Sequence, residues 1–180
     1  YFDRCFGKNQ INEILWALNI TGYECKYSDP RFSKTYEYGI FREQYMTLEE
    51  YKKKYFDSSR PYTVGLLESN MYVSNGQLQP YYALIKSLEA KGCNVIPVVA
   101  AGGSENQLKV MVKYFTNAPS YEAYLNNPLK YTNNVNAIIS MPAYGIGGNL
   151  FDNTTKYFET AGVPVFRAVH SDYVSNEEWE

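Results

Sequence analysis

The chain has 180 residues, of which 45% are hydrophobic and 20% charged, and its formal net charge at pH 7 is −2. This composition is typical of a globular protein with a substantial core, and no apolar run approaches the length that a membrane-spanning helix needs. The slightly acidic balance argues against the clustered basic surface on which nucleic-acid binding depends.

Three cysteines, Cys5, Cys25 and Cys93, occur without any paired C-x-x-C spacing. Their number and spacing exclude a thiolate zinc site of the usual kind and a complete disulfide framework. Cys93 opens a predicted buried strand and is expected to fill core space, whereas Cys5 and Cys25 either pair or stay free. The chain begins at Tyr1 without a signal-like segment, so we expect a piece of a larger protein whose localisation is not encoded here.

The first third of the chain is predicted to be mostly helical. Apolar residues at helical spacing predict a helix over residues 9–19, and a short aromatic run at 36–41 is a possible strand. A second helix is expected to begin after Thr47, which has the residue type of an N-cap and is followed by two glutamates. We therefore treat residues 1–60 as an N-terminal flanking segment or subdomain.

An alternation of strands and helices begins after Pro61. The short apolar run 63–67 predicts a buried strand, and residues 68–76 a polar turn. A helix is expected next because apolar side chains recur at spacings of three and four, at Leu78, Tyr81, Tyr82, Ile85 and Leu88. A second buried strand at 94–99 makes a parallel pair with the first, joined by a right-handed crossover.

Two further βα units complete the pattern. The first unit has a predicted helix at residues 105–115, an asparagine-rich insertion with one short helix at 118–134, and a strand at 136–140. The second has a glycine-rich loop at 141–150, a helix at 152–161 and a strand at 163–169. Residues 61–180 are therefore expected to form an α/β domain: a flavodoxin-like (Rossmann-like) doubly wound parallel sheet of about four strands with flanking helices.

In such a sheet, ligands bind where the strand order reverses, between the first and third strands. The loops 68–76 and 141–150 would meet there and offer polar side chains, two tyrosine rings and glycine backbone. The candidate ligand-binding residues are Glu68, Ser69, Asn70, Tyr72, Tyr144, Gly145, Gly147 and Gly148. The alternative is that both loops are solvated and merely close the fold.

Several familiar motifs are missing or incomplete. The run Gly145-Ile146-Gly147-Gly148 lacks the third glycine of a dinucleotide fingerprint and follows the wrong strand for one. No Walker loop occurs, so no nucleotide cofactor is expected to bind through that motif. His170 is the only histidine, which excludes a multi-histidine metal site and leaves it as a candidate single metal contact or a structural residue.

Several stretches match one family in order and spacing: Phe6-Gly7-Lys8-Asn9, Tyr38-Gly39-Ile40-Phe41, and residues 46–51, 60–67, 88–98, 135–140, 161–167 and 177–179. Together they resemble the large subunit of cobaltochelatase and magnesium chelatase, the CobN type. The resemblance spans nearly the whole chain. Each piece alone is generic α/β sequence, and their common order makes the match specific.

The resemblance implies an ATP-dependent ligase that inserts cobalt into a corrin or magnesium into a porphyrin. The large subunit of such an enzyme holds the tetrapyrrole and the metal, while separate ATPase subunits are its partners, which agrees with the missing Walker loop. This chain alone would bind the ring without turnover, with Tyr72, Tyr144 and the loop Gly145–Gly148 beside the ring and Glu68 and His170 as polar or metal contacts. No catalytic residue of the family transfers to this segment, and a chelatase would be cytoplasmic.

Two departures from the family pattern suggest a divergent member. Arg42-Glu43 stands where a histidine-proline pair usually follows the Gly-Ile-Tyr stretch, and one glycine replaces a pair near Gly7. An alternative is a non-enzymatic binding or adhesin-like module at the cell surface, which the glycosylation sequons at Asn19 and Asn153 motivate. A third is small-ligand binding at the strand switch point.

Overall fold

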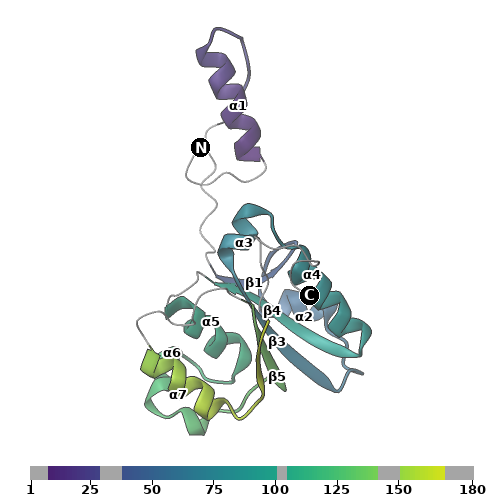
Figure 1. Cartoon of the computed structure of the whole chain (residues 1–180), viewed down its shortest axis with the longest axis vertical. Coiled ribbons are helices and arrows are strands. Elements are labelled where there is room, and N and C mark those ends of the chain that lie inside the picture. Colours follow the sequence, from purple (N-terminus) through teal and green to yellow (C-terminus); the bar gives the residue numbers. More distant parts are fainter. Residues whose placement is uncertain (1–7, 29–37, 101–104, 142–150, 169–180) are drawn as a thin grey trace, which may run out of the picture.

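The computed structural model describes residues 8–28, 38–100, 105–141 and 151–168 (Figure 1). Their strands form one six-stranded sheet in the order β2-β1-β4-β3-β5-β6. The strands are β1 (Gly39–Arg42), β2 (Gln44–Met46), β3 (Tyr62–Ser69), β4 (Cys93–Ala100), β5 (Ala137–Ser140) and β6 (Val165–Arg167). The helices are α1 (Lys8–Ile20), α2 (Leu48–Tyr55), α3 (Asn70–Asn75), α4 (Gln79–Ala90), α5 (Glu105–Phe115), α6 (Tyr121–Asn126) and α7 (Phe151–Ala161), with a 3-10 turn at Pro128–Lys130.

The strands β4, β3, β5 and β6 are parallel neighbours. In chain order this is second, first, third and fourth, the arrangement of a flavodoxin-like sheet, so the predicted α/β fold class is confirmed. The helices α3 and α4 pack on one face, whereas α5, α6 and α7 pack on the other (Figure 1). Both faces are covered, which explains why β3 and β4 are apolar almost throughout.

The sheet has two strands beyond the four predicted for it, and the first of them, β1, overlaps the possible strand at residues 36–41. β1 runs antiparallel to β4, with Gly39 opposite Val99, and β2 pairs antiparallel with β1. The hairpin buries Ile40 on one face and Phe41 on the other, which extends both layers of the core. Residues 39–46, which sequence analysis assigned to the flanking segment, therefore lie in the sheet itself.

The predicted helix near the N-terminus is present as α1, and the chain returns along it. Asn12 Oδ1 accepts a hydrogen bond from Ser28 N at 3.0 Å, and Asn19 Nδ2 donates one to Cys25 O at 3.0 Å. Ile11 and Ile14 of the predicted apolar face are exposed in the described part of the chain. None of the described helices is both long and apolar enough to cross a membrane.

Asparagine side chains hold several irregular connections by replacing backbone partners. Asn94 is buried at the start of β4, and its Oδ1 and Nδ2 bond to the N and O atoms of Asp57, each at 2.9 Å. Asn136 Oδ1 accepts from Thr63 N at 2.8 Å, which fixes the first residues of β3. Asn134 Nδ2 donates to Thr116 O at 2.7 Å. Asn134, at the end of the asparagine-rich insertion, therefore satisfies a backbone carbonyl with its side-chain amide, as Asn94 does at the start of β4.

Candidate functional site

The strand switch point lies between β3 and β5, as predicted, because β4 lies on the other side of β3. The segment after β3 differs from the expected polar turn. β3 continues to Ser69, and the next residues form the helix α3. Ser69 caps this helix by accepting a hydrogen bond from Met71 N at 3.3 Å, and Gly76, at φ 70°, ends it in the left-handed region.

The structure brings the first three predicted site residues together at the carboxyl end of β3. Glu68 and Ser69 are 1% and 3% exposed, and Ser69 N donates to Glu68 Oε1 at 2.6 Å. Asn70 follows as the first residue of α3 and is partly exposed. Tyr72 is placed differently, because its ring is buried in the core beside Leu78 and Tyr81 rather than lying in an open cleft.

The other predicted site residues lie outside the described residues. These are Tyr144, Gly145, Gly147 and Gly148 in the segment after β5, and His170 after β6. They remain predictions. Within the described ranges, no three His, Cys, Asp or Glu side chains converge as a metal site would require.

Two buried tyrosines lie near this part of the fold. Tyr81 is fully enclosed, and its hydroxyl donates to Phe41 O at 2.7 Å. Burial raises its pKa well above the ordinary value, and the charges of Tyr51 and Glu68 add to the effect. Burial also raises the pKa of Tyr51 to about 12, although Arg42 beside it acts in the opposite direction. Both phenols are therefore held in the neutral form.

Stability is expected to fall as the pH rises above about 10, the pKa of an unfolded tyrosine. The folded state has the higher pKa, so the unfolded state releases these protons first, and the stabilisation is lost between about pH 10 and 12 for Tyr51. Urea unfolding at stepwise alkaline pH, with tyrosinate absorbance followed in parallel, measures this. The Tyr51→Phe variant should show a shallower loss; an identical pH dependence would contradict the assignment.

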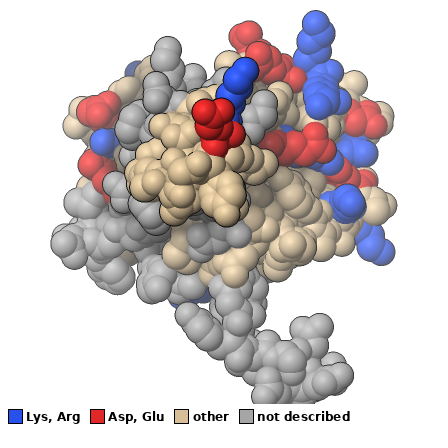
Figure 2. Space-filling model, turned by 90° about the horizontal axis from the view of Figure 1, so that it is seen from above, with Lys and Arg blue, Asp and Glu red and all other residues tan. Residues whose placement is uncertain are grey.

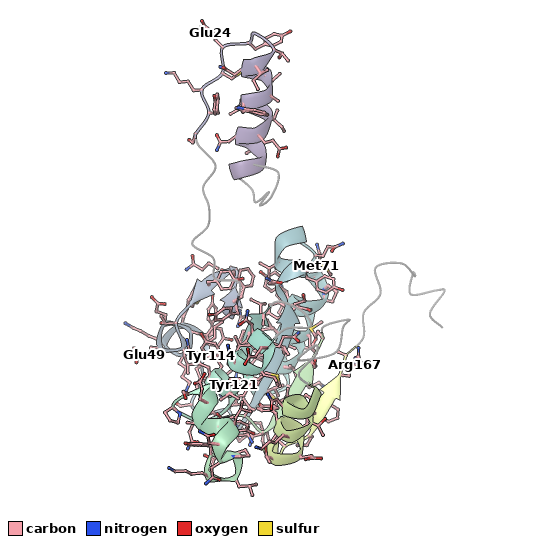
Figure 3. The ribbon with its side chains drawn as sticks, turned by 90° about the vertical axis from the view of Figure 1, so that its left-hand side faces the viewer. Glu24, Glu49, Met71, Tyr114, Tyr121 and Arg167 are labelled. Atoms are coloured by element: carbon pink, nitrogen blue, oxygen red, sulfur yellow. The ribbon has the colours of Figure 1, made fainter. Side chains whose placement is uncertain are left out.

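A cleft of about 510 Å³ lies between the β1–β2 hairpin, the first turn of α2 and the last turn of α5. Figure 3 labels Tyr114 on α5 and Glu49 on α2. We call this space the tyrosine cleft. Its ring, apolar and cationic lining residues are Tyr38, Tyr45, Tyr114, Met46, Leu48 and Lys113. A mainly apolar and aromatic lining with few polar groups, at this volume, is typical of small-molecule sites.

Gly39 forms part of the cleft wall between two of the rings. A Cβ atom on it would lie 3.6 Å from Tyr114 Oη and 3.8 Å from Tyr45 Cδ1. Its φ of 145° lies in a region that L side chains rarely adopt, so glycine is favoured for the backbone rather than for space. Both rings therefore lie close to the start of β1.

The two charged side chains of the cleft, Glu50 and Lys113, differ in how far their charged atoms are engaged by described residues. Glu50 accepts hydrogen bonds from Thr47 N at 2.8 Å and Thr47 Oγ1 at 2.9 Å, while its own N donates to Thr47 Oγ1. These bonds lower the pKa of Glu50 and engage its carboxylate in the capping box of α2. Lys113 is exposed, lies 5.1 Å from the Tyr114 ring centroid and forms no salt bridge with a described residue.

Sequence reasoning did not identify the tyrosine cleft. Its rings come from three separated segments, and their proximity depends on the pairing of β1 with β4. The available signal was the succession of two short aromatic runs before the Thr47 cap, which is compatible with a hairpin.

At the end of β1, Arg42 connects three elements. Its Nη1 and Nη2 donate to Glu89 Oε1 and Oε2 on α4 at 2.5 and 3.0 Å. The guanidinium carbon lies 4.2 Å from the ring centroid of Tyr55 on α2. Burial acts to lower the pKa of Arg42, but the hydrogen bonds and charge interactions with Glu89 and Tyr51 together outweigh it and raise the pKa above the ordinary value. Arg42 therefore holds β1, α2 and α4 together.

The parallel order of β3 to β6, the switch point and the cleft at the added hairpin define an α/β domain of the flavodoxin-like class. The family model described as CobN/Magnesium Chelatase matches residues 5–180. The chain belongs to the CobN/magnesium chelatase family, as its sequence motifs predicted. No individually curated protein shows a significant sequence match to it.

Proposed function

We propose that this chain is part of a chelatase large subunit and holds a corrin or porphyrin during ATP-dependent insertion of cobalt or magnesium. The observation that carries this proposal is the family match along residues 5–180. The metal is a substrate of that reaction, and separate ATPase subunits are the proposed partners. The chain alone is expected to bind the ring without turnover. The family match lends no support to the surface-module alternative.

The geometry supports ring binding at the carboxyl edge of the parallel strands. Glu68 at the end of β3 and Gly39 at the start of β1 both pair with Val99, so the switch point and the tyrosine cleft lie along the same edge. Two strand spacings separate them, roughly 10 Å. In this proposal Glu68, Ser69 and Asn70 supply polar contacts. The predicted contacts from Tyr144, the glycine loop and His170 belong to the same proposal.

The purified chain is expected to bind a tetrapyrrole saturably. Titration with deuteroporphyrin IX and with cobyrinic acid should quench tyrosine and tryptophan fluorescence and shift the visible absorption band of the bound ring. Aromatic and apolar walls exclude water from a bound macrocycle, which shifts its absorption band. The bound ring also quenches the fluorescence of nearby tyrosine and tryptophan side chains by energy transfer. The urea-unfolded chain is the control for non-specific adsorption. If neither ring binds better to the folded chain than to the unfolded chain, the proposed function is wrong.

A further inference from the structure

We infer that the tyrosine cleft receives a carboxylate-bearing edge of the tetrapyrrole, with Lys113 as the partner of the carboxylate. This inference rests on the proposed function and goes further, because it names a site that sequence reasoning did not predict. It also names the chemistry of recognition. The cleft binds a flat apolar surface and an anion side by side.

The aromatic wall supplies the flat apolar surface. Tyr38 is 43% exposed and Tyr45 is partly exposed, so both rings have surface left to cover, whereas Tyr114 is almost fully buried. Tyr45 is held by an edge contact to Phe41, with ring centroids 5.0 Å apart. Rings that are held in place lose little conformational freedom when they pack against a planar ligand.

Charge decides which end of the ligand enters. The carboxylate of Glu50 is engaged by Thr47, whereas Lys113 lies at the cleft with a ring contact and without a described acidic partner. An ammonium group over an aromatic ring still has donors available for an anion. Corrin and porphyrin precursors carry carboxylate side chains on an apolar macrocycle, so they present both features that the cleft complements.

The neighbouring Lys109 provides a matched control on the same helix. Its Nζ is already 3.3 Å from Glu105 Oε2, and it is not among the cleft residues. Lys113 and Lys109 are four residues apart on α5, so their substitution alters the charge of one helix equally. Tyr62, which is exposed at the opposite end of the parallel strands, is the control for the cleft tyrosines.

The first experiment compares deuteroporphyrin IX with its uncharged dimethyl ester. Lys113→Met should weaken binding of the acid about tenfold and leave binding of the ester within twofold, since only the acid offers a charge partner. Lys109→Met should change neither. Because Lys113 is an exposed surface residue, this variant is expected to keep the native fold, which circular dichroism verifies. If the Lys113→Met variant binds the acid with the same affinity as the unaltered chain does, and likewise the ester, Lys113 is not the partner of the carboxylate.

The second experiment removes the ring surface. The double substitution Tyr38→Leu and Tyr45→Leu should weaken both acid and ester at least tenfold, while Tyr62→Leu should leave both unchanged. If the unaltered chain binds the porphyrin and the double variant binds it equally well, the ring lies elsewhere and the inference fails while the proposed function stands. If the unaltered chain binds no ring, the proposed function itself fails.

Discussion

The Gly65→Val substitution is expected to destabilise the fold by about 3 kcal/mol or more. Gly65 lies in the middle of β3 and pairs with Ile96 on one side and Ile138 on the other. A Cβ atom on Gly65 would lie 2.9 Å from Cε1 and Cζ of Phe115, closer than side-chain carbons approach one another. The new side chain therefore requires either the ring or the strand to move.

Neither can move at low cost. The Phe115 ring is fully buried in the cluster that joins α5 to the sheet, and β3 is hydrogen-bonded to strands on both sides. Interiors packed at this density respond to added volume with strained rotamers and backbone shifts. The absence of a side chain at Gly65 is thus what allows α5 to pack closely on the sheet.

Urea unfolding of a double-mutant cycle tests this explanation. Gly65→Ala should cost about 1–3 kcal/mol in the unaltered background and markedly less together with Phe115→Leu, which removes the atoms that clash. The Gly65→Val variant should show the same partial rescue. Equal costs of Gly65→Ala in both backgrounds would mean that the ring is not what excludes a side chain from this position.

The second large effect is expected at the ion pair between Arg42 and Glu89. Arg42→Met should lower the free energy of unfolding by about 2–3 kcal/mol, below the 3–5 kcal/mol typical of a fully buried pair. The discount reflects residual exposure, because the two side chains are 16% and 18% exposed. Arg42→Met leaves the Glu89 carboxylate partly desolvated without its bidentate partner.

A double-mutant cycle of Arg42 and Glu89 should show that the two side chains act as a unit. Adding Glu89→Leu to Arg42→Met should restore part of the lost stability, since two apolar side chains leave no uncompensated charge. Lys109→Met, which breaks an exposed pair 3.3 Å long, is the control and should cost less than about 0.5 kcal/mol. Strictly additive single costs at Arg42 and Glu89 would show that the pair does not act as a unit.

This ion pair also gives a structural role to a residue that departs from the expected family pattern. At Arg42, where the resemblance led us to expect a histidine, the side chain is engaged by Glu89 and Tyr55. In this chain the position therefore connects the hairpin to α4 and α2. Its role is explained by packing and charge within the domain.

The parallel part of the fold was predictable because each of its strands and main helices leaves a local pattern in the sequence. β3 and β4 are buried on both faces, so each is a nearly continuous apolar run, and α4 and α5 show helical spacing between them. β2 was missed because it has three residues and pairs only with β1. α3 was missed because its six residues are not strong helix formers and depend on the Ser69 cap and on burial of Tyr72.

The candidate site was likewise predictable only where it follows from local sequence patterns and strand order. The position of the switch point follows from strand order, and strand order follows from the rules of parallel connections. The burial of Tyr72 could not be foreseen, because a polar-looking stretch concealed a short helix that turns this ring inward. The tyrosine cleft requires knowing that Gly39 pairs with Val99, which no local pattern encodes.

The antiparallel hairpin has a consequence for the order in which the protein folds. β3, α3, α4 and β4 are consecutive, so the contacts between β3 and β4 close a short loop, whereas β1 must wait for a strand that comes much later in the chain. We expect the hairpin to dock after the parallel core has formed, so substitutions at Arg42 should accelerate unfolding more than they slow folding. The hairpin side of the cleft would then be the last part of the domain to assemble and the first to open, on a timescale separate from global unfolding.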